Sequence, residues 1–311
     1  MAHPRRLRFG VQLHTAATGE EWAALARKVE DLGFDTLFLP DHFGDQLAPV
    51  PAMMAAAAAT TTLKVGTLVF DNDYKHPVVL AKEMATIDRL SGGRTEIGLG
   101  AGWMLSDYEQ AGIAYDTGKV RVDRFEEGLA VLKGLLGPDP VTFEGAHYRI
   151  TGLDGLPKPV QSPPPILVGG GLKRMLTIAA READIIGINP TMPNGAADAD
   201  AARTGTAEHT DEKLRWVKEA SGDRYDDLEI NLLTLGCFVT DDRAGLAEQF
   251  APLFGLSTEE LLEFPHAFIG TTEEICETIL ARRERWDASY IVVQSDALDA
   301  MAPVVATLAG T

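Results

Sequence analysis

A histidine and an aspartate stand together where a short hydrophobic run ends, in the segment TLFLPDH. The apolar residues 37–39 give way to Pro40, and Asp41 and His42 follow. An imidazole with an ordinary pKa of about 6.5 can donate or accept a proton near neutral pH. Asp41 beside it can orient the ring or raise its basicity. A strand that simply reaches solvent would also end in polar residues, so other strand ends must be compared.

A glycine-rich turn follows another buried run, in PILVGGGLKRMLTIAAREA. Without side chains, Gly169, Gly170 and Gly171 let the backbone approach a ligand, and the following helix start favours an anion. Lys173 and Arg174 fall in the first turn of that helix, where a cation opposes the helix dipole. Phosphate binding explains these residues, and a tight turn with solvated cations is the alternative.

A second glycine-rich run, GLGAGW, spans residues 98–103. Gly100, Ala101 and Gly102 leave the backbone bare, and Trp103 places an indole beside it. A flat aromatic ring system can lie against such a backbone. The alternative is that Trp103 is an ordinary core residue.

Segments with strand character alternate with segments of helical period along the whole chain. The expected strands are residues 7–13, 36–41, 64–71, 95–102, 165–170, 184–189, 228–240 and 290–294. The main helices expected between them are residues 18–33, 51–61, 76–90, 117–136, 172–182, 207–221 and 298–309. Eight alternating units predict an α/β fold of the TIM-type (β/α)8 barrel class, which typically takes about 250 residues. A doubly wound sheet is the main rival. We expect one domain over residues 1–311, with insertions at about 138–164 and 191–206.

Composition excludes several other classes of protein. The net charge of −18 and the lack of a basic run argue against a nucleic-acid partner. The two cysteines, Cys237 and Cys276, form no CxxC pair, so neither a disulfide framework nor a cysteine-built metal site is expected, and we predict no metal. The apolar stretch in the basic start MAHPRRLRFGVQL is too short for a signal peptide, and no run reaches membrane-spanning length. We therefore expect a cytoplasmic protein that binds no membrane.

Three long segments resemble the luciferase-like monooxygenase superfamily. HPVVLAKEMATIDRLSGGRTEIGLGAGW (76–103) resembles its central signature, and LPKPVQSPPPILVGGGLKRMLTIAAREADIIGI (156–188) resembles its second signature. FIGTTEEICETILARRERW (268–286) and the ending APVVATLAG are similar to its C-terminal part. The resemblance covers nearly the whole chain. It points to the branch that uses coenzyme F420, a deazaflavin, while other branches use FMN.

The resemblance implies a luciferase-like barrel with a set of cofactor-binding positions. A non-prolyl cis peptide is implied at the end of the third strand, near Leu68 and Val69, where it supports the flavin ring. Asp41 and His42 match the acid and histidine that face the ring in deazaflavin enzymes. The glycines at 169–171 match the backbone cradle for the cofactor phosphate.

One departure from the family bears on the activity. Members often carry Asn after the Gly-Trp pair, whereas Met104 stands here, and the acid of the sugar-phosphate dehydrogenase branch would align near Ala101. The resemblance therefore does not support sugar-phosphate oxidation, and His42 becomes the expected proton donor.

The sequence thus predicts an F420-dependent oxidoreductase that transfers a hydride to or from a small organic substrate, acting as a reductase. An activated C=C or C=N bond would suit such a reductase. An FMN-dependent monooxygenase is the alternative, and a catalytically silent flavin-binding protein is the second. Expected partners are a small-molecule substrate, a reductase that supplies reduced cofactor, and a second copy in a homodimer built on the apolar helices 51–61 and 76–90.

Overall fold

The computed structural model describes residues 5–311. Residues 1–4, part of the basic N-terminal segment, lie outside the described residues. The chain forms two compact units. Unit 1 comprises the described residues up to Leu13 together with Lys28–Leu37 and Val168–Thr311, and unit 2 comprises His14–Arg27 and Phe38–Leu167. The single-domain organisation stays a prediction.

Nine strands form the main sheet. In chain order they are β1 (Arg8–Gln12), β2 (Thr36–Leu39), β3 (Lys64–Thr67), β4 (Phe70–Asp71), β5 (Thr95–Gly100), β8 (Ile166–Gly170), β9 (Ile185–Ile188), β10 (Glu229–Leu233) and β13 (Ala288–Gln294). Their order is β3-β2-β1-β13-β10-β9-β8-β5-β4, and a further β3–β5 pairing closes it. β3 and β4 pair in parallel with successive parts of β5, so they are two halves of one broken strand. Eight strand positions remain, and the predicted (β/α)8 class is confirmed.

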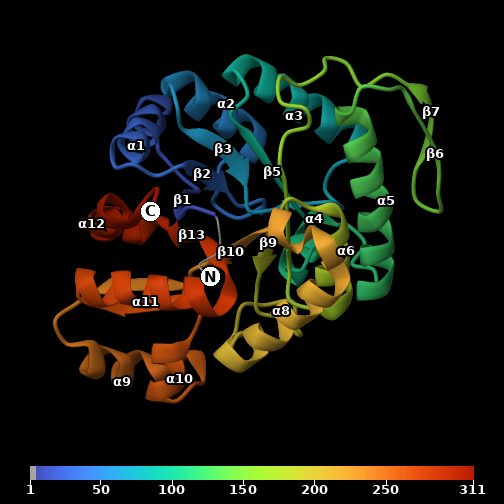
Figure 1. Cartoon of the computed structure of the whole chain (residues 1–311). Coiled ribbons are helices and arrows are strands. Elements are labelled where there is room, and N and C mark those ends of the chain that lie inside the picture. Colours follow the sequence, from blue (N-terminus) through green and yellow to red (C-terminus); the bar gives the residue numbers. More distant parts are fainter. Residues whose placement is uncertain (1–4) are drawn as a thin grey trace. The chain divides into compact units, whose positions relative to one another are not determined.

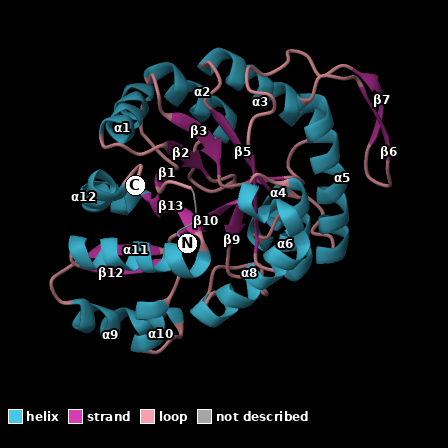
Figure 2. Cartoon of the chain, viewed as in Figure 1, coloured by secondary structure: helices cyan, strands magenta, loops and turns pink. Residues whose placement is uncertain are grey.

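Four strands lie outside this sheet. β6 (Val141–Glu144) and β7 (Arg149–Leu153) form an antiparallel hairpin in the predicted 138–164 insertion, and Figure 2 shows it beside α5. β11 (Gly236–Val239) and β12 (Ala267–Gly270) form a separate parallel pair. The prediction of one strand over 228–240 was wrong. At Thr234 the backbone N–H still bonds Val292 of β13, but that of Leu235 bonds His266, so the chain changes partner between them.

Within residues 5–311 the chain forms twelve α-helices and two 3-10 turns. They are α1 (Gly19–Asp31), α2 (Pro49–Ala59), α3 (Pro77–Ser91), α4 (Leu105–Ala111), α5 (Gly118–Leu136), α6 (Lys173–Glu182), α7 (Ala199–Arg203), α8 (Ala207–Ser221), α9 (Arg243–Phe254), α10 (Thr258–Glu263), α11 (Thr272–Trp286) and α12 (Leu298–Leu308), with 3-10 turns η1 (Gly222–Asp227) and η2 (Ser295–Ala297). α3 is typical, because His76 caps its first turn, Pro77 begins it and Gly92 ends it in the left-handed region. None of the helices within residues 5–311 combines the length and apolar character needed to cross a membrane.

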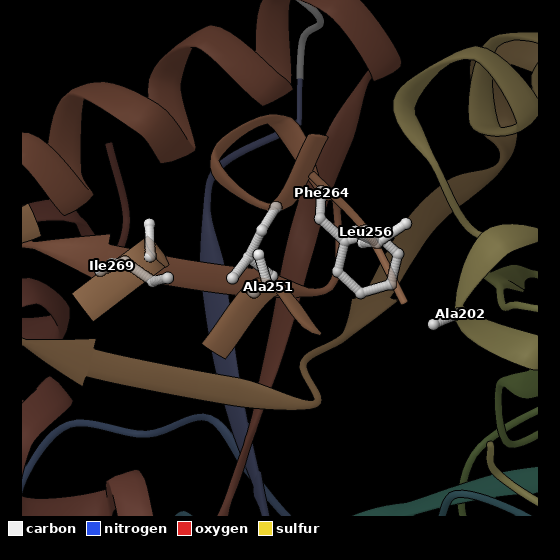
Figure 3. Packing of buried hydrophobic residues seen from close by; sticks show 8 residues of the cluster. Ala202, Ala251, Leu256, Phe264 and Ile269 are labelled. Carbon is white, nitrogen blue, oxygen red and sulfur yellow. The ribbon is translucent and has the colours of Figure 1, made fainter. Parts of the chain in front are cut away.

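Unit 1 contains a hydrophobic cluster of its own, formed by residues of α7, α9, α10 and β12 and by residues beside them. Figure 1 shows α9 and α10 below α11. Leu256, Phe264 and Ile269 are buried there, together with Ala202 from α7 (Figure 3). α7 falls inside the predicted 191–206 insertion, and Asp198 caps it by accepting from Ala201 N. Ala202, together with the hydrogen bonds of Arg203 Nε to the Gly255 carbonyl oxygen and of Lys213 Nζ to the Thr204 carbonyl oxygen, ties this segment to the rest of the unit.

Candidate active site

His42 lies just beyond β2, whose four residues are all buried. Its side chain is 19% exposed, and its Nδ1 atom lies 2.7 Å from Oδ2 of Asp107. Because a carboxylate only accepts hydrogen bonds, Nδ1 carries the proton in this contact. In neutral His42 the Nε2 atom is therefore the one with a free lone pair. The edge of the imidazole also meets Trp103, at 5.4 Å between ring centroids.

Asp107 is the carboxylate that orients His42, and the sequence interpretation missed it. It lies in the first turn of α4, with a side chain only 8% exposed. The Tyr74 hydroxyl donates to the same Oδ2 atom at 3.2 Å. A seven-residue helix is too short for a periodic pattern. The available signal was an acid one turn beyond the Gly-Trp pair.

Asp41 has a different partner from the one suggested by its place beside His42. Its Oδ2 atom accepts the backbone N–H of Asp71 at 3.2 Å. Burial raises the pKa of the Asp41 carboxyl above its ordinary value, although the Asp71 N–H bond and the charges of Lys75 and His42 act against this. Asp41 thus joins the end of β2 to β4, and Asp107 holds the imidazole.

The break between β3 and β4 contains a cis peptide bond between Leu68 and Val69, at the position that the resemblance implied. The glycines of β5 fit around this break. A Cβ at Gly98 would lie 1.9 Å from the Thr67 carbonyl oxygen, and one at Gly100 would lie 2.8 Å from Val69 Cγ2. The bare backbone of β5 is thus explained by its own neighbours. Cofactor binding by Leu68, Val69, Gly100, Ala101 and Gly102 stays a prediction.

Tyr108, the next residue of α4, reaches a second group of acids. Its hydroxyl lies 2.9 Å from Asp71 Oδ2 and 3.1 Å from Asp73 Oδ2. Gly102, with φ +76°, makes room for it, because a Cβ there would lie 1.9 Å from the hydroxyl. Burial raises the pKa of Tyr108, so its phenol keeps its proton.

The turn after β8 belongs to unit 1. A Cβ at Gly170 would lie 2.8 Å from Met175 Cβ. One at Gly171 would lie 2.7 Å from the carbonyl oxygens of both Asn189 and Pro190. Close packing against neighbouring residues therefore explains why Gly170 and Gly171 carry no side chain.

The helix that follows this turn retains an anion-binding character. α6 begins at Lys173, and its N-cap residue Leu172 makes no side-chain cap. Its first N–H groups thus suit a phosphate, and the exposed Lys173 and Arg174 add charge. Lys173 Nζ also lies 5.8 Å from the Trp216 ring. Phosphate binding by Gly169, Gly170, Gly171, Lys173 and Arg174 stays a prediction.

Taken by itself, unit 2 presents a histidine whose tautomer is fixed by a buried carboxylate and whose Nε2 atom is left for chemistry. Such a pair moves a proton to or from a bound substrate. It supplies no electrons, so a redox reaction at this site needs a cofactor that does.

Known proteins match the chain over most of its length. A family model described as luciferase-like monooxygenase matches residues 6–307. An F420-dependent glucose-6-phosphate dehydrogenase from Nakamurella multipartita is 32% identical over 190 residues, which cover 58% of this chain and 56% of that protein. The matched part thus spans little more than half of this relative. An FMNH(2)-dependent dimethylsulfone monooxygenase from Pseudomonas putida is 28% identical over 285 residues, covering 83% and 78% of the two chains.

Solved structures show the same fold. The coenzyme F420 dependent tetrahydromethanopterin reductase from Methanopyrus kandleri superposes with a TM-score of 0.77 and covers 97% of this chain and 98% of that one. The two sequences are 18% identical, so this likeness concerns the fold alone.

Proposed function

The chain belongs to the luciferase-like monooxygenase family, whose model matches residues 6–307, and we propose that it is a coenzyme F420-dependent oxidoreductase. The observation that carries the proposal is the His42–Asp107 pair, which provides a proton-transfer group of fixed tautomer. The relative that uses F420 supports the choice of cofactor.

His42 moves the proton that accompanies hydride transfer. When the imidazole is neutral, Nε2 accepts a proton from a substrate that is being oxidised. When both nitrogens are protonated, Nε2 donates to a substrate that is being reduced. Asp107 keeps the ring oriented in both cases, and Tyr74 holds Asp107 through the same oxygen.

The cofactor-binding residues fit a phosphate-bearing flavin or deazaflavin. Within unit 1, the first turn of α6, with Lys173 and Arg174, is proposed to bind a phosphate. Within unit 2, the backbone from Gly100 to Gly102, with Leu68 and Val69, is proposed to bind a flat ring. A bound deazaflavin would supply two electrons as a hydride. This chain binds it, orients it and manages the proton.

Reduction is the direction that we propose, with an activated C=C or C=N bond as acceptor. A separate reductase would then supply reduced F420. A homodimer through α2 and α3 is proposed on the exposure of apolar residues on α3, where Val79 is 48% and Leu90 is 66% exposed. Ala101 at the position of the acid of the sugar-phosphate dehydrogenase branch, together with the Met104 departure, predicts that glucose 6-phosphate is not a substrate.

FMN-dependent oxygenation is the second candidate. The specific observation in its favour is the FMNH(2)-dependent relative, which matches 83% of this chain. His42 suits this chemistry too, since it also needs a proton donor near the ring.

A parallel titration tests the choice. Purified protein is titrated with F420 and with FMN, each oxidised and reduced, by fluorescence and by heat. Micromolar or tighter F420 binding with weak FMN binding supports the proposal. The reverse preference overturns it and directs the next assay to oxygen consumption, and binding of neither favours a silent protein. His42→Asn is expected to bind the cofactor but to lose turnover, whereas His209→Asn, at an exposed position of α8, changes neither.

A further inference from the structure

The buried Tyr108 hydroxyl lies between two carboxyl groups. It is within 2.9 Å of Asp71 Oδ2 and 3.1 Å of Asp73 Oδ2. A phenol has one proton, so it donates to one of these oxygens only. If both aspartates were ionised, the hydroxyl oxygen of Tyr108 would face the second carboxylate oxygen with no proton between them. One carboxyl must therefore be protonated for both contacts to be hydrogen bonds.

The proton belongs to Asp71. Asp73 is paired with Arg124, whose Nη1 atom lies 2.9 Å from Asp73 Oδ1, so the ionised form of Asp73 is stabilised. Within residues 5–311, the hydrogen-bond partners of the Asp71 carboxyl are the Tyr108 hydroxyl and the backbone N–H of Asp73. Neither is a cation. The protonated Asp71 carboxyl then donates to the Tyr108 hydroxyl, and the Tyr108 hydroxyl donates to the Asp73 carboxylate.

The surroundings of Asp71 favour its neutral form. Burial raises the pKa of Asp71 to about 7, and the charge of Asp73 acts in the same direction, against the bonds from the Asp73 N–H and Tyr108. Several other groups contribute to the field around it. The titratable and charged groups near Asp71 are Asp41 and His42 beyond β2, Asp73, Tyr74 and Lys75 beyond β4, Asp107 and Tyr108 on α4, and Arg124 on α5.

The protonated Asp71 is linked to the catalytic pair through α4. Asp107, which holds His42, and Tyr108, which is held by Asp71, are consecutive residues of this seven-residue helix. The helix has no side-chain cap from its N-cap residue Met104. Tyr74, the other hydrogen-bond donor to Asp107, lies three residues beyond Asp71. Asp71 thus contacts Tyr108 through its carboxyl group, and its carbonyl oxygen accepts the backbone N–H of Tyr74 at 3.2 Å.

We propose that Asp71 is a positioning residue for the His42–Asp107 pair, and that it holds α4 in place by keeping a proton that it shares with Tyr108. The proposal rests on the proposed role of His42 in catalysis. When Asp71 loses this proton, the Tyr108 hydroxyl lies between two carboxylates and can donate its single proton to only one of them. The contact between α4 and β4 then weakens, and Asp107 moves with it.

The test follows the His42 imidazole directly by nitrogen NMR across pH, in protein labelled at histidine. The variants are Asp71→Asn and Tyr108→Phe. The Asp71→Asn side chain keeps both functions of a protonated carboxyl, since its amide nitrogen donates to Tyr108 and its oxygen accepts from the Asp73 N–H. The control is Tyr225→Phe, because Tyr225 is another tyrosine that donates to a carboxylate, Asp287, at 2.5 Å.

In the wild type, the Nδ1–H signal of His42 is expected to weaken as Asp71 ionises. In Asp71→Asn this alkaline change disappears, in Tyr108→Phe the signal is weakened at every pH, and Tyr225→Phe behaves as the wild type. Identical His42 titrations in the wild type and Asp71→Asn, or an unchanged signal in Tyr108→Phe, would overturn the proposal.

Turnover with the preferred cofactor provides a second readout. Tyr108→Phe should lower kcat about 10- to 100-fold through displacement of His42, with a smaller effect on KM. In the wild type kcat should fall at alkaline pH as Asp71 ionises, and in Asp71→Asn this fall should be absent. If no turnover is found with F420 or FMN, the proposed function fails, and the NMR experiment still decides the role of Asp71.

Discussion

The His42 imidazole and the Asp107 carboxylate are joined at 2.7 Å, and one oxygen of Asp107 takes the bonds from both His42 and Tyr74. The pair fixes which nitrogen of neutral His42 carries the proton. Asp107→Asn removes this constraint, because an amide can present either a donor or an acceptor to Nδ1. We expect kcat to fall about 10²- to 10⁴-fold with cofactor affinity retained. Stopped-flow reduction or oxidation of the bound cofactor measures it, with Asp299→Asn, an exposed aspartate of α12, as the control. Equal losses in both variants would contradict the role of Asp107.

Gly102→Ala should destabilise the protein. Its φ of +76° disfavours any side chain, and the new methyl group would meet the Tyr108 hydroxyl. We expect a loss of about 1–3 kcal/mol in the free energy of unfolding, measured by urea denaturation. Gly118→Ala is the matched control, since Gly118 begins α5 and has open space around its Cβ position. Similar stabilities for the two variants would argue against the steric contact.

The pH dependence of stability should report Asp71. Its pKa is raised from 3.8 to about 7 in the folded chain, so folding holds its proton more tightly than the unfolded chain does. The contribution of Asp71 to stability is fully present below pH 3.8, falls as the pH rises towards about 7 and is lost above that. Asp71→Asn lacks this decline. The difference in unfolding free energy between variant and wild type should therefore shift in favour of the variant between about pH 4 and about pH 7. Parallel curves from the two proteins would refute it.

Glu127 should control the turn of the β6–β7 hairpin. Its carboxylate accepts the backbone N–H groups of Ala146, His147 and Tyr148. Burial raises the pKa of Glu127, but these bonds outweigh it and hold the pKa below its ordinary value. The stabilisation is thus present at neutral pH and is lost as the pH falls through the lowered pKa.

Glu127→Gln should speed the amide hydrogen exchange of His147 and Tyr148, at a cost of about 1–2 kcal/mol in local stability. Glu248→Gln, at an exposed position of α9, should leave this exchange unchanged. Unaltered protection in Glu127→Gln would mean that the turn is held by other contacts.

The contribution of the cations at the start of α6 to cofactor binding can be tested with a control in the same helix. Lys173→Ala combined with Arg174→Ala should weaken the binding of the preferred cofactor about tenfold, and the loss should shrink at high salt, because exposed charges are screened. Arg181→Ala removes a cation from the last turn of the same helix and should have little effect. Equal losses at both ends of α6 would contradict a phosphate site at its start.

The sequence predicted the barrel because its strands are buried runs and some of the helices between them have end signals, such as His76, Pro77 and Gly92 at α3. His42 was predicted as a site residue because it closely follows such a run. Asp107 and Tyr108 were missed because α4 is a single short element whose role depends on tertiary contacts. The break at residues 234–235 was missed because the hydrophobic run continues through it, and only the partner of the backbone changes.

The glycines of the two rich runs were assigned to ligand approach, whereas several are required by the chain itself. Gly98, Gly100 and Gly171 would each place a Cβ within 3 Å of a neighbouring atom. A glycine in a sequence indicates that space is needed beside the backbone. It does not show whether a ligand or another residue of the chain fills that space. The distinction depends on which atoms tertiary folding brings to that position.

The space at Gly102 has an evolutionary consequence. Residue 102 can carry a side chain only if the hydroxyl of Tyr108 is absent or moved, and without that hydroxyl Asp71 and Asp73 lose the proton donor between them. Positions 102, 108, 71 and 73 are therefore expected to change together in the history of this branch. A relative with a side chain at the position of Gly102 should lack the tyrosine, and should carry a neutral residue in place of one of the two aspartates.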